Sequence, residues 1–324
     1  MGTPSRTAFY TSPLCLQHEM GKGNPECPLR LEKIEELMMT TGLDTQLIPM
    51  VAPKAAYIDL LAAHDPDYLQ FLSHSSPQSG VLKLNLDTSM NPYTWEAAQI
   101  AAGAGVDAVD RILEGQFDKA FCAVRPPGHH AHRDHSGGFC FLNNVCIAAL
   151  HALKVKNLDR VAIVDFDVHH GDGTSDILGG NEKVLIVDSF QDGLFPYAHK
   201  RTKPSNALYT PFTEGMGGEE LMVNVDKYWE PAIKKFAPDM IFVSAGFDGH
   251  REEDQAQLLM VESNYAFIAR RLVQWFNDIP NCKGIVCLLE GGYSTSSLAR
   301  SCVAFIRQLS APGRNDTLKE DEGL

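Results

Sequence analysis

Short apolar runs alternate with helical segments along most of the chain, and this alternation constrains the fold more than any other feature of the sequence. Each run has the length of one strand, and the segments between the runs carry the apolar periodicity of helices. Parallel strands require such crossovers, so the pattern predicts an α/β fold: a mostly parallel sheet with helices on both faces. The predicted strands lie at residues 7–10, 46–51, 120–124, 161–165, 184–187, 240–244 and 284–289.

The length and composition indicate one domain. Among the 324 residues, 44% are apolar and 21% are charged, which suits a globular chain with a sizeable core. No internal repeat and no Pro/Gly-rich linker divides the chain. We therefore expect a single domain over residues 1–310, followed by a polar, acidic tail at 311–324.

Charge and cysteine content narrow the class of protein. A formal net charge of −13 argues against a direct nucleic-acid partner and suits a basic peptide or a polyamine better. The eight cysteines form no CxxC pair and lie mostly in apolar segments, which is typical of reduced core residues in an intracellular protein. No apolar run approaches the length of a membrane span. We expect no membrane contact and a cytoplasmic location, with a nuclear one left open.

The segment that follows the predicted strand 161–165 is unusually rich in acids and histidines. It reads DFDVHHGDG from Asp165, and on an extended backbone Asp165, Asp167 and His169 project to one side. Two carboxylates and an imidazole at a strand end form a candidate cation site. The alternative is a polar loop, which this density of acids and histidines disfavours.

Reactive residues also follow three other predicted strands. His129 and His130 come after the strand at 120–124, Asp248 after the strand at 240–244, and Glu290 and Tyr293 after the strand at 284–289. In open α/β sheets, ligands bind outside the carboxyl ends of the strands. We therefore expect these groups to meet at one edge of the sheet.

The residue types suggest metal-dependent hydrolysis. Asp167, His169 and Asp248 would give a cation three ligands and an open position, which suits zinc and also iron(II), cobalt or manganese. If both histidine pairs ligated metals, a binuclear site would form. Asp165 and Asp172 remain as carboxylates that orient histidines, and Tyr293 as a hydroxyl donor to a carbonyl oxygen, although a tyrosine after two glycines is usually a turn residue. We expect His132 and His135, in the next loop, to be solvated.

Several motifs in order resemble one known superfamily. They are RPPGHHA, GFCFLNNVCIAA, VDFDVHHGDGT, VSAGFD and LEGGY, preceded by NPECPLR at residues 24–30. Together they are similar to the zinc-dependent histone deacetylase and acetylpolyamine amidohydrolase superfamily, over residues 24–309. The resemblance implies a single-domain arginase/deacetylase-type fold with an eight-stranded, mostly parallel sheet.

The resemblance also implies roles for individual residues. Asp167, His169 and Asp248 match zinc ligands, His129 is paired with Asp165, and His130 is paired with Asp172. His130 matches the principal general base and acid, while Tyr293 matches the residue that polarises the acetyl carbonyl. Phe139 and Phe195 match the walls of an acetyl-lysine tunnel, with Gly138 beside them and Asp87 at a rim position that holds the substrate backbone. Backbone carbonyls of five residues match a structural potassium site: Asp165, Asp167, His169, Asp188 and Ser189.

The chain departs from the family pattern around the tunnel mouth. Phe190-Gln191 replaces the usual His-Gln, the segment 203–218 lacks the usual glycine-rich return to a strand, and the loop at 249–254 is acidic. In polyamine specialists a carboxylate shortly after the third zinc ligand meets the distant ammonium, and here Gln255 lies near that position. Glu252, Glu253 and Asp254 would replace it only if the loop folds inward, and an acidic run like this is typical of a solvated rim.

The sequence therefore predicts a metal-dependent deacetylase that acts on acetyl-lysine side chains of peptides or proteins. Acetylpolyamine hydrolysis is the first alternative. An arginase-like dimetal hydrolase would need more acids around the His129-His130 pair, and an inactive acyl-lysine reader would lack a ligand or the tyrosine. The sequence leaves open whether the chain forms a homo-oligomer.

Overall fold

Eight parallel strands form the central sheet of the protein. The structure is a computed structural model, and it describes residues 6–154, 158–197 and 203–312. The strand order is β2-β1-β5-β10-β9-β6-β7-β8, and every neighbouring pair is parallel, as the sequence predicts. The strands are β1 (Thr7–Thr11), β2 (Ile48–Val51), β5 (Lys119–Cys122), β6 (Val161–Asp165), β7 (Val184–Asp188), β8 (Ala207–Tyr209), β9 (Met240–Ala245) and β10 (Ile285–Leu289).

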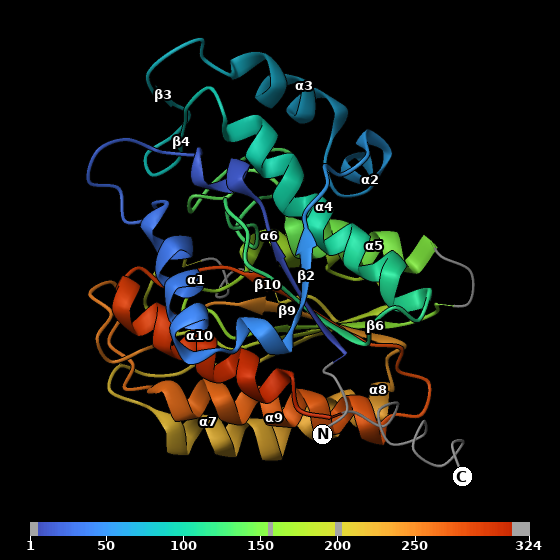
Figure 1. Cartoon of the computed structure of the whole chain (residues 1–324). Coiled ribbons are helices and arrows are strands. Elements are labelled where there is room, and N and C mark those ends of the chain that lie inside the picture. Colours follow the sequence, from blue (N-terminus) through green and yellow to red (C-terminus); the bar gives the residue numbers. More distant parts are fainter. Residues whose placement is uncertain (1–5, 155–157, 198–202, 313–324) are drawn as a thin grey trace.

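Helices cover both faces of the sheet (Figure 1). One layer contains α2 (Tyr57–Ala63), α4 (Thr94–Leu113) and α5 (Asn144–Lys154), and the opposite layer contains α1 (Leu29–Thr41), α9 (Glu262–Asp278) and α10 (Thr295–Leu309). Gly105 lets α4 and α5 approach closely, because a Cβ there would lie 2.9 Å from the Cβ of Ala148. The central strands β5, β6, β9 and β10 are buried on both sides, which is why they appear in the sequence as continuous apolar runs.

The last strand of the described chain, β10, occupies the middle of the sheet. β10 pairs with β5 on one side and with β9 on the other. Val286 of β10 lies opposite Ala120 of β5 and opposite Phe242 of β9. Within the described residues, the two halves of the sheet are therefore joined only by β10, the strand that comes last in sequence order.

Some elements differ from the sequence prediction. The predicted helix at 219–235 is α7 (Gly218–Asn224), a π-helical turn at Val225–Trp229 and α8 (Glu230–Phe236) in succession. The segment 203–218 contains the edge strand β8, and a small hairpin of β3 (Leu82–Lys83) and β4 (Ser89–Met90) lies in the region predicted as loop after α3 (Pro66–Ser75). Two- and three-residue strands carry too little apolar periodicity to be seen in a sequence.

All eight cysteines are free thiols, and only Cys27 is not buried. Within the described residues, no helix has both the length and the hydropathy that a membrane crossing requires. Residues 313–324 of the predicted tail lie outside the described part of the chain.

One histidine connects three helices and should make stability depend on pH. The ring nitrogens of His151 on α5 lie 2.9 Å from Oδ1 of Asp59 on α2 and 2.8 Å from Oδ1 of Asp110 on α4. Burial alone would lower the pKa of His151, but the hydrogen bonds with Asp110 and Asp59 outweigh it and raise the pKa. Since the folded-state pKa is raised, the stabilisation is complete below the unfolded pKa of about 6.5 and is lost as the pH rises through the raised value.

We therefore expect His151→Gln to lower the free energy of unfolding by about 1 kcal/mol at acidic pH, and by less as the pH increases. Thermal unfolding of the two proteins between about pH 6 and pH 9 measures this difference. A difference that grows with pH would contradict the proposed protonation of His151.

Candidate active site

The four strand ends singled out in the sequence meet at one edge of the sheet. β5, β6, β9 and β10 are adjacent and parallel, so the segments that follow them leave the sheet on the same side. Hydrogen bonds connect all four segments there: side-chain oxygens accept backbone N–H groups of neighbouring segments, and His129 contacts Asp165. The fold thus brings together residues that are far apart in the sequence.

Asp167, His169 and Asp248 form a compact cluster with the composition of a metal site. One donor atom from each lies within 4.8 Å of the other two, and no other such group of three occurs in the described ranges. Nδ1 of His169 lies 3.0 Å from Oδ1 of Asp167 and 3.2 Å from Oδ2 of Asp248. The two carboxylates raise the pKa of this imidazole to about 10, although burial opposes the shift.

The cluster fits a divalent cation in three respects. Oδ2 of Asp248 is buried and, although Nδ1 of His169 lies 3.2 Å from it, accepts no well-aligned hydrogen bond from the described residues. The pKa of Asp248 is raised, because burial and the charge of Asp167 both oppose its ionisation, and a cation between the carboxylates would remove that opposition. The space beside them is kept by glycine: a Cβ on Gly291 would lie 2.0 Å from Oδ2 of Asp248, and one on Gly246 would lie 2.1 Å from Oδ2 of Asp167.

His129 contacts Asp165 and is fixed at its backbone by Glu290. Its Nδ1 lies 3.0 Å from Oδ2 of Asp165. Oε2 of the fully buried Glu290 accepts the N–H of Gly128 at 2.7 Å and that of His129 at 3.1 Å. Burial would lower the pKa of His129, but the charges of Asp167, Asp165 and Glu290 hold it well above its ordinary value.

His130 contacts Asp172 and is kept neutral. Its Nδ1 lies 2.7 Å from Oδ1 of Asp172, while burial and then the charge of His129 lower its pKa to about 4. With Nδ1–H donated to the carboxylate, Nε2 carries a free lone pair at neutral pH. This is the state that a general base requires.

Asp172 has a second histidine partner that the sequence interpretation missed. The prediction that His132 is solvated was wrong, since its Nε2 lies 3.1 Å from Oδ2 of Asp172. His135 does lie largely in solvent, with a side chain that is 60% exposed. Neither histidine belongs to a cluster of metal-binding side chains in the described ranges.

A cavity of about 290 Å³ opens beside His130, and its lining includes two of the four predicted tunnel residues, Asp87 and Phe195, but not Gly138 or Phe139. Asp87, Phe195 and Pro196 line it together with His132 and Asp172. The ring of Phe195 stands edge-on to that of His130 at 5.0 Å between centroids. The candidate general base therefore belongs to the wall of this cavity.

The tunnel wall is built on strained backbone. Phe139 has a φ of 68°, and its ring stands edge-on to that of Tyr293 at 5.6 Å between centroids. A Cβ on Gly138 would lie 2.3 Å from Cδ2 of His130, so only glycine fits there. Oδ1 of Asp87 accepts the N–H of Gly138 at 3.2 Å. The predicted rim residue thus holds the backbone of the tunnel wall. A non-glycine residue at positive φ is typical of functional sites, where strain is tolerated.

Tyr293 is held on two sides. The guanidinium of Arg30 lies 5.0 Å from its ring centroid. Its N–H donates to Oε2 of Glu253 at 2.7 Å. The prediction of a solvated acidic rim was therefore wrong for Glu253, which is 7% exposed and accepts backbone N–H groups of the tyrosine turn. Burial raises the pKa of Tyr293 well above its ordinary value, against the lowering effect of Arg30, so the hydroxyl keeps its proton.

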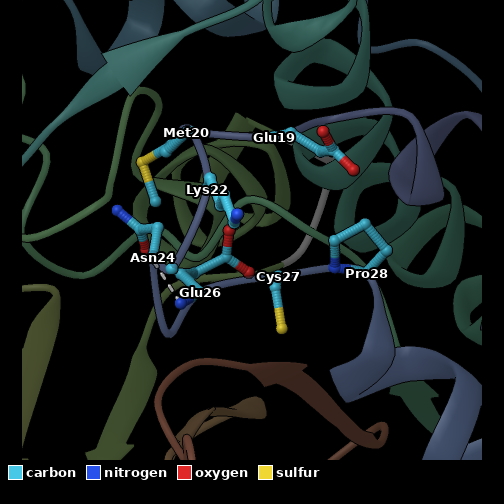
Figure 2. A pocket seen from close by; sticks show the side chains of 9 residues that line it. Glu19, Met20, Lys22, Asn24, Glu26, Cys27 and Pro28 are labelled. Carbon is cyan, nitrogen blue, oxygen red and sulfur yellow. Dashed lines mark hydrogen bonds between the residues drawn. The ribbon is translucent and has the colours of Figure 1, made fainter.

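A buried ionic cluster beneath the site is a further feature that the sequence did not reveal. The carboxylate of Glu26 accepts hydrogen bonds from Arg30, at 3.0 Å, and from Nε and Nη2 of Arg125, all three side chains being fully buried. Arg30 also donates to the carbonyls of Glu290 and Gly292. Figure 2 shows Glu26 in the loop at 19–28, which encloses a pocket of about 350 Å³. The cluster thereby supports the segments that follow β5 and β10. The one sequence signal for this cluster was Arg125, an arginine directly after an apolar strand.

The predicted potassium site stays a prediction. In the region of its carbonyls, the N–H of Ser189 donates to the carbonyl of Asp165 at 3.0 Å, and Nδ1 of His170 lies 2.6 Å from Oδ2 of Asp188. These contacts connect the ends of β6 and β7.

Comparisons with known proteins agree with this geometry. The family model described as "Histone deacetylase domain" matches residues 24–309. A protein of Archaeoglobus fulgidus named "Probable deacetylase" is 34% identical over 288 residues, which are 86% of this chain and 79% of that protein. "Polyamine deacetylase HDAC10" of Homo sapiens is 30% identical over 309 residues, which are 88% of this chain and 45% of that protein. The solved structure "Crystal Structure of HDA15 HD domain" is 29% identical, with a TM-score of 0.86 over 96% of this chain and 94% of its own.

Proposed function

The chain belongs to the histone deacetylase family, and on that premise we propose that it hydrolyses the acetyl amide of acetyl-lysine side chains in peptides or proteins. One observation carries the proposal: a three-ligand metal cluster, a histidine–aspartate pair and a protonated tyrosine lie at the same ends of the central strands, and a cavity lined by the histidine–aspartate pair opens beside them. These are the groups that amide hydrolysis needs, namely a site for a Lewis acid, a base and an oxyanion donor.

Zinc is the cation that we assign to the cluster, in keeping with the family norm. Asp167, His169 and Asp248 would hold it. When bound, the ion supplies Lewis acidity toward the acetyl carbonyl oxygen and lowers the pKa of a water molecule.

His130 would move the protons of the reaction. Nε2 takes a proton from the attacking water while Nδ1–H keeps donating its hydrogen bond to the ionised carboxylate of Asp172, which stabilises the imidazolium. The same proton then passes to the nitrogen of the leaving amine as the amide C–N bond breaks, and the remaining proton of the added water also passes to the amine, so that acetate and an ammonium group are released. His129, with its raised pKa and its contact with Asp165, would act as a fixed positive charge beside the reacting carbonyl.

Tyr293 would donate its hydroxyl hydrogen bond to the carbonyl oxygen as that oxygen becomes negative. We expect Tyr293→Phe to lower kcat by about 10²–10³-fold, the usual loss when one oxyanion donor is removed. Fold and zinc content should stay unchanged, because the cluster of Asp167, His169 and Asp248 contains no atom of this side chain. Steady-state kinetics with elemental analysis tests this, and unchanged turnover would exclude the hydroxyl from the mechanism.

The acids near the tunnel favour an acetyl-lysine peptide over a polyamine. Both carboxylate oxygens of Glu252 accept hydrogen bonds from Nη2 of Arg300 at 2.8 Å, and Glu253 is occupied by the backbone of the tyrosine turn. The cavity lining contains neither of them. Neither acid therefore provides the countercharge that a polyamine specialist places opposite the distant ammonium.

Acetylpolyamine hydrolysis remains the second candidate, because one relative is named a polyamine deacetylase. The exposed Asp254 is the acid of the loop that stays available for an ammonium group.

A direct comparison of substrates tests the proposed function. We expect kcat/KM for an acetyl-lysine peptide to exceed that for N-acetylputrescine and N-acetylspermidine. A preference of tenfold or more for the polyamines, about 1.4 kcal/mol in transition-state binding, would overturn the choice of substrate. Asp254→Asn would then be the first variant to measure.

A further inference from the structure

The carboxylate of Asp172 is shared between two histidines. Oδ1 lies 2.7 Å from Nδ1 of His130, and Oδ2 lies 3.1 Å from Nε2 of His132. The side chain of Asp172 is 11% exposed and that of His132 is 19% exposed, so the second contact lies between the candidate base and the surface. Nothing in the proposed reaction so far uses His132.

His132 is a cation with both ring nitrogens engaged. Burial alone would lower its pKa, but hydrogen bonds with Asp172 and Asp176 raise it to about 9. Nδ1 lies 3.5 Å from Oδ2 of Asp176, and the ring stacks on that of His135 at 4.1 Å between centroids. At neutral pH both nitrogens of His132 therefore carry hydrogens, and Nε2–H is the donor to Asp172.

The backbone of His132 is fixed by a neighbouring helix junction. Nδ1 of the buried His64 donates to the carbonyl of His132 at 2.9 Å, while Nε2 of His64 accepts the N–H of Asn143 at 2.9 Å. On the other side, the N–H of Arg133 donates to Oδ2 of Asp176 at 3.0 Å. The position of His132 is thus determined by the fold and not by a free loop.

We propose that His132 is a positioning residue for His130: its Nε2–H holds Oδ2 of Asp172, and so keeps Oδ1 turned toward Nδ1 of His130. A carboxylate can rotate about its Cβ–Cγ bond, and donors on both oxygens restrict that rotation. The orientation of His130 then depends on the hydrogen bond between His132 and Asp172, although His132 does not contact His130 through a hydrogen bond of its own. This inference rests on the deacetylation proposed above.

Two other roles fit the chemistry less well. A proton exit path through Asp172 has no task, because amide hydrolysis near neutral pH yields a carboxylate and an ammonium with no net proton. His132 lines the cavity, so a direct contact with substrate is the other alternative. Both of its ring nitrogens, however, already have acidic partners, Asp172 and Asp176. The experiment below separates that role by its effect on KM.

The test compares two substitutions with a distant control. His132→Leu removes the donor, His132→Gln keeps an N–H near the position of Nε2, and His74→Leu makes the same change on the exposed face of α3. We expect His132→Leu to lower kcat by about 10-fold or more with KM within about twofold, in line with losses of supporting hydrogen bonds. His132→Gln should recover most of the loss, and His74→Leu should match the unchanged protein.

The orientation of His130 can also be followed without turnover. The Nδ1–H of His130 should give a downfield proton resonance in slow exchange with water, assigned by its loss in His130→Ala. It should persist in the His132→Gln protein and broaden or disappear in the His132→Leu protein. If the chain deacetylates none of the substrates tested, this spectrum still decides the role of His132, and only the proposed function fails.

Three outcomes would overturn the inference. The first is an unchanged kcat together with an unchanged resonance in a folded His132→Leu protein. The second is a rise in KM at constant kcat, which would make His132 a substrate contact. The third is a His132→Gln protein as impaired as the His132→Leu protein, since a neutral donor would then be insufficient.

Discussion

Asp248→Ala is expected to abolish both metal binding and activity. The carboxylate of Asp248 supplies one of the three ligands. In the described residues, no fourth side chain belongs to this cluster and could take its place. With two ligands left, a site of this type loses most of its affinity, and with it the Lewis acid. We expect zinc to fall from about one ion per chain to near zero, and kcat/KM to fall by about 10³-fold or more.

Elemental analysis and steady-state kinetics on the same preparations test this expectation. Asp44→Ala, in an exposed turn remote from the sheet edge, is the matched control and should keep both zinc and activity. Two tightly bound ions per chain would instead support the dimetal alternative. Full activity of a thoroughly metal-free protein would refute metal dependence altogether.

His130→Ala is expected to stop catalysis while leaving the metal in place. General acid–base catalysis contributes about 10²–10⁴-fold, and His130 is the imidazole whose pKa of about 4 leaves it neutral and able to accept a proton. Since His130 is not among the three clustered ligands, zinc content should stay near one ion per chain. The comparison thus separates loss of the base from loss of the metal.

The adjacent histidine provides the internal control. The pKa of His129 is raised and its Nδ1 lies 3.0 Å from Asp165, so it is less suited than His130 to accept a proton, and His129→Ala should cost less kcat than His130→Ala. A larger loss for His129→Ala would reverse the two assignments. Equal losses in both variants, with equal zinc content, would indicate that the pair acts as one unit.

The central strands and the reactive strand ends could be predicted from the sequence for a physical reason. Strands buried on both faces must be continuously apolar, so the acids and histidines that follow them are conspicuous. Parallel connections then carry all the carboxyl ends to one edge, which is why Asp167 and Asp248 could be placed together although 80 residues separate the segments. The family resemblance added the histidine–aspartate pairing, which spacing alone leaves open.

Contacts between distant loops could not be predicted in this way. Glu253 belongs to an acidic run that is typical of solvent exposure, yet it is buried because the tyrosine turn presents two unpaired N–H groups to it. His132 looked like a solvated loop residue, because the sequence does not show that the fold places the second carboxylate oxygen of Asp172 next to it. Glu26 and Arg125 are 99 residues apart, and only the folded chain reveals that each compensates the buried charge of the other.

The central position of β10 has a consequence for how the protein is made. During synthesis the growing chain can pair β2, β1 and β5, and later β9, β6, β7 and β8, but these two groups stay separate until residues 285–289 have left the ribosome. Until then β5 and β9 each present an open, apolar edge, the kind that recruits other chains and chaperones. Nascent chains that stop before β10 should therefore aggregate, and catalytic competence should appear only after β10 has joined the two groups of strands.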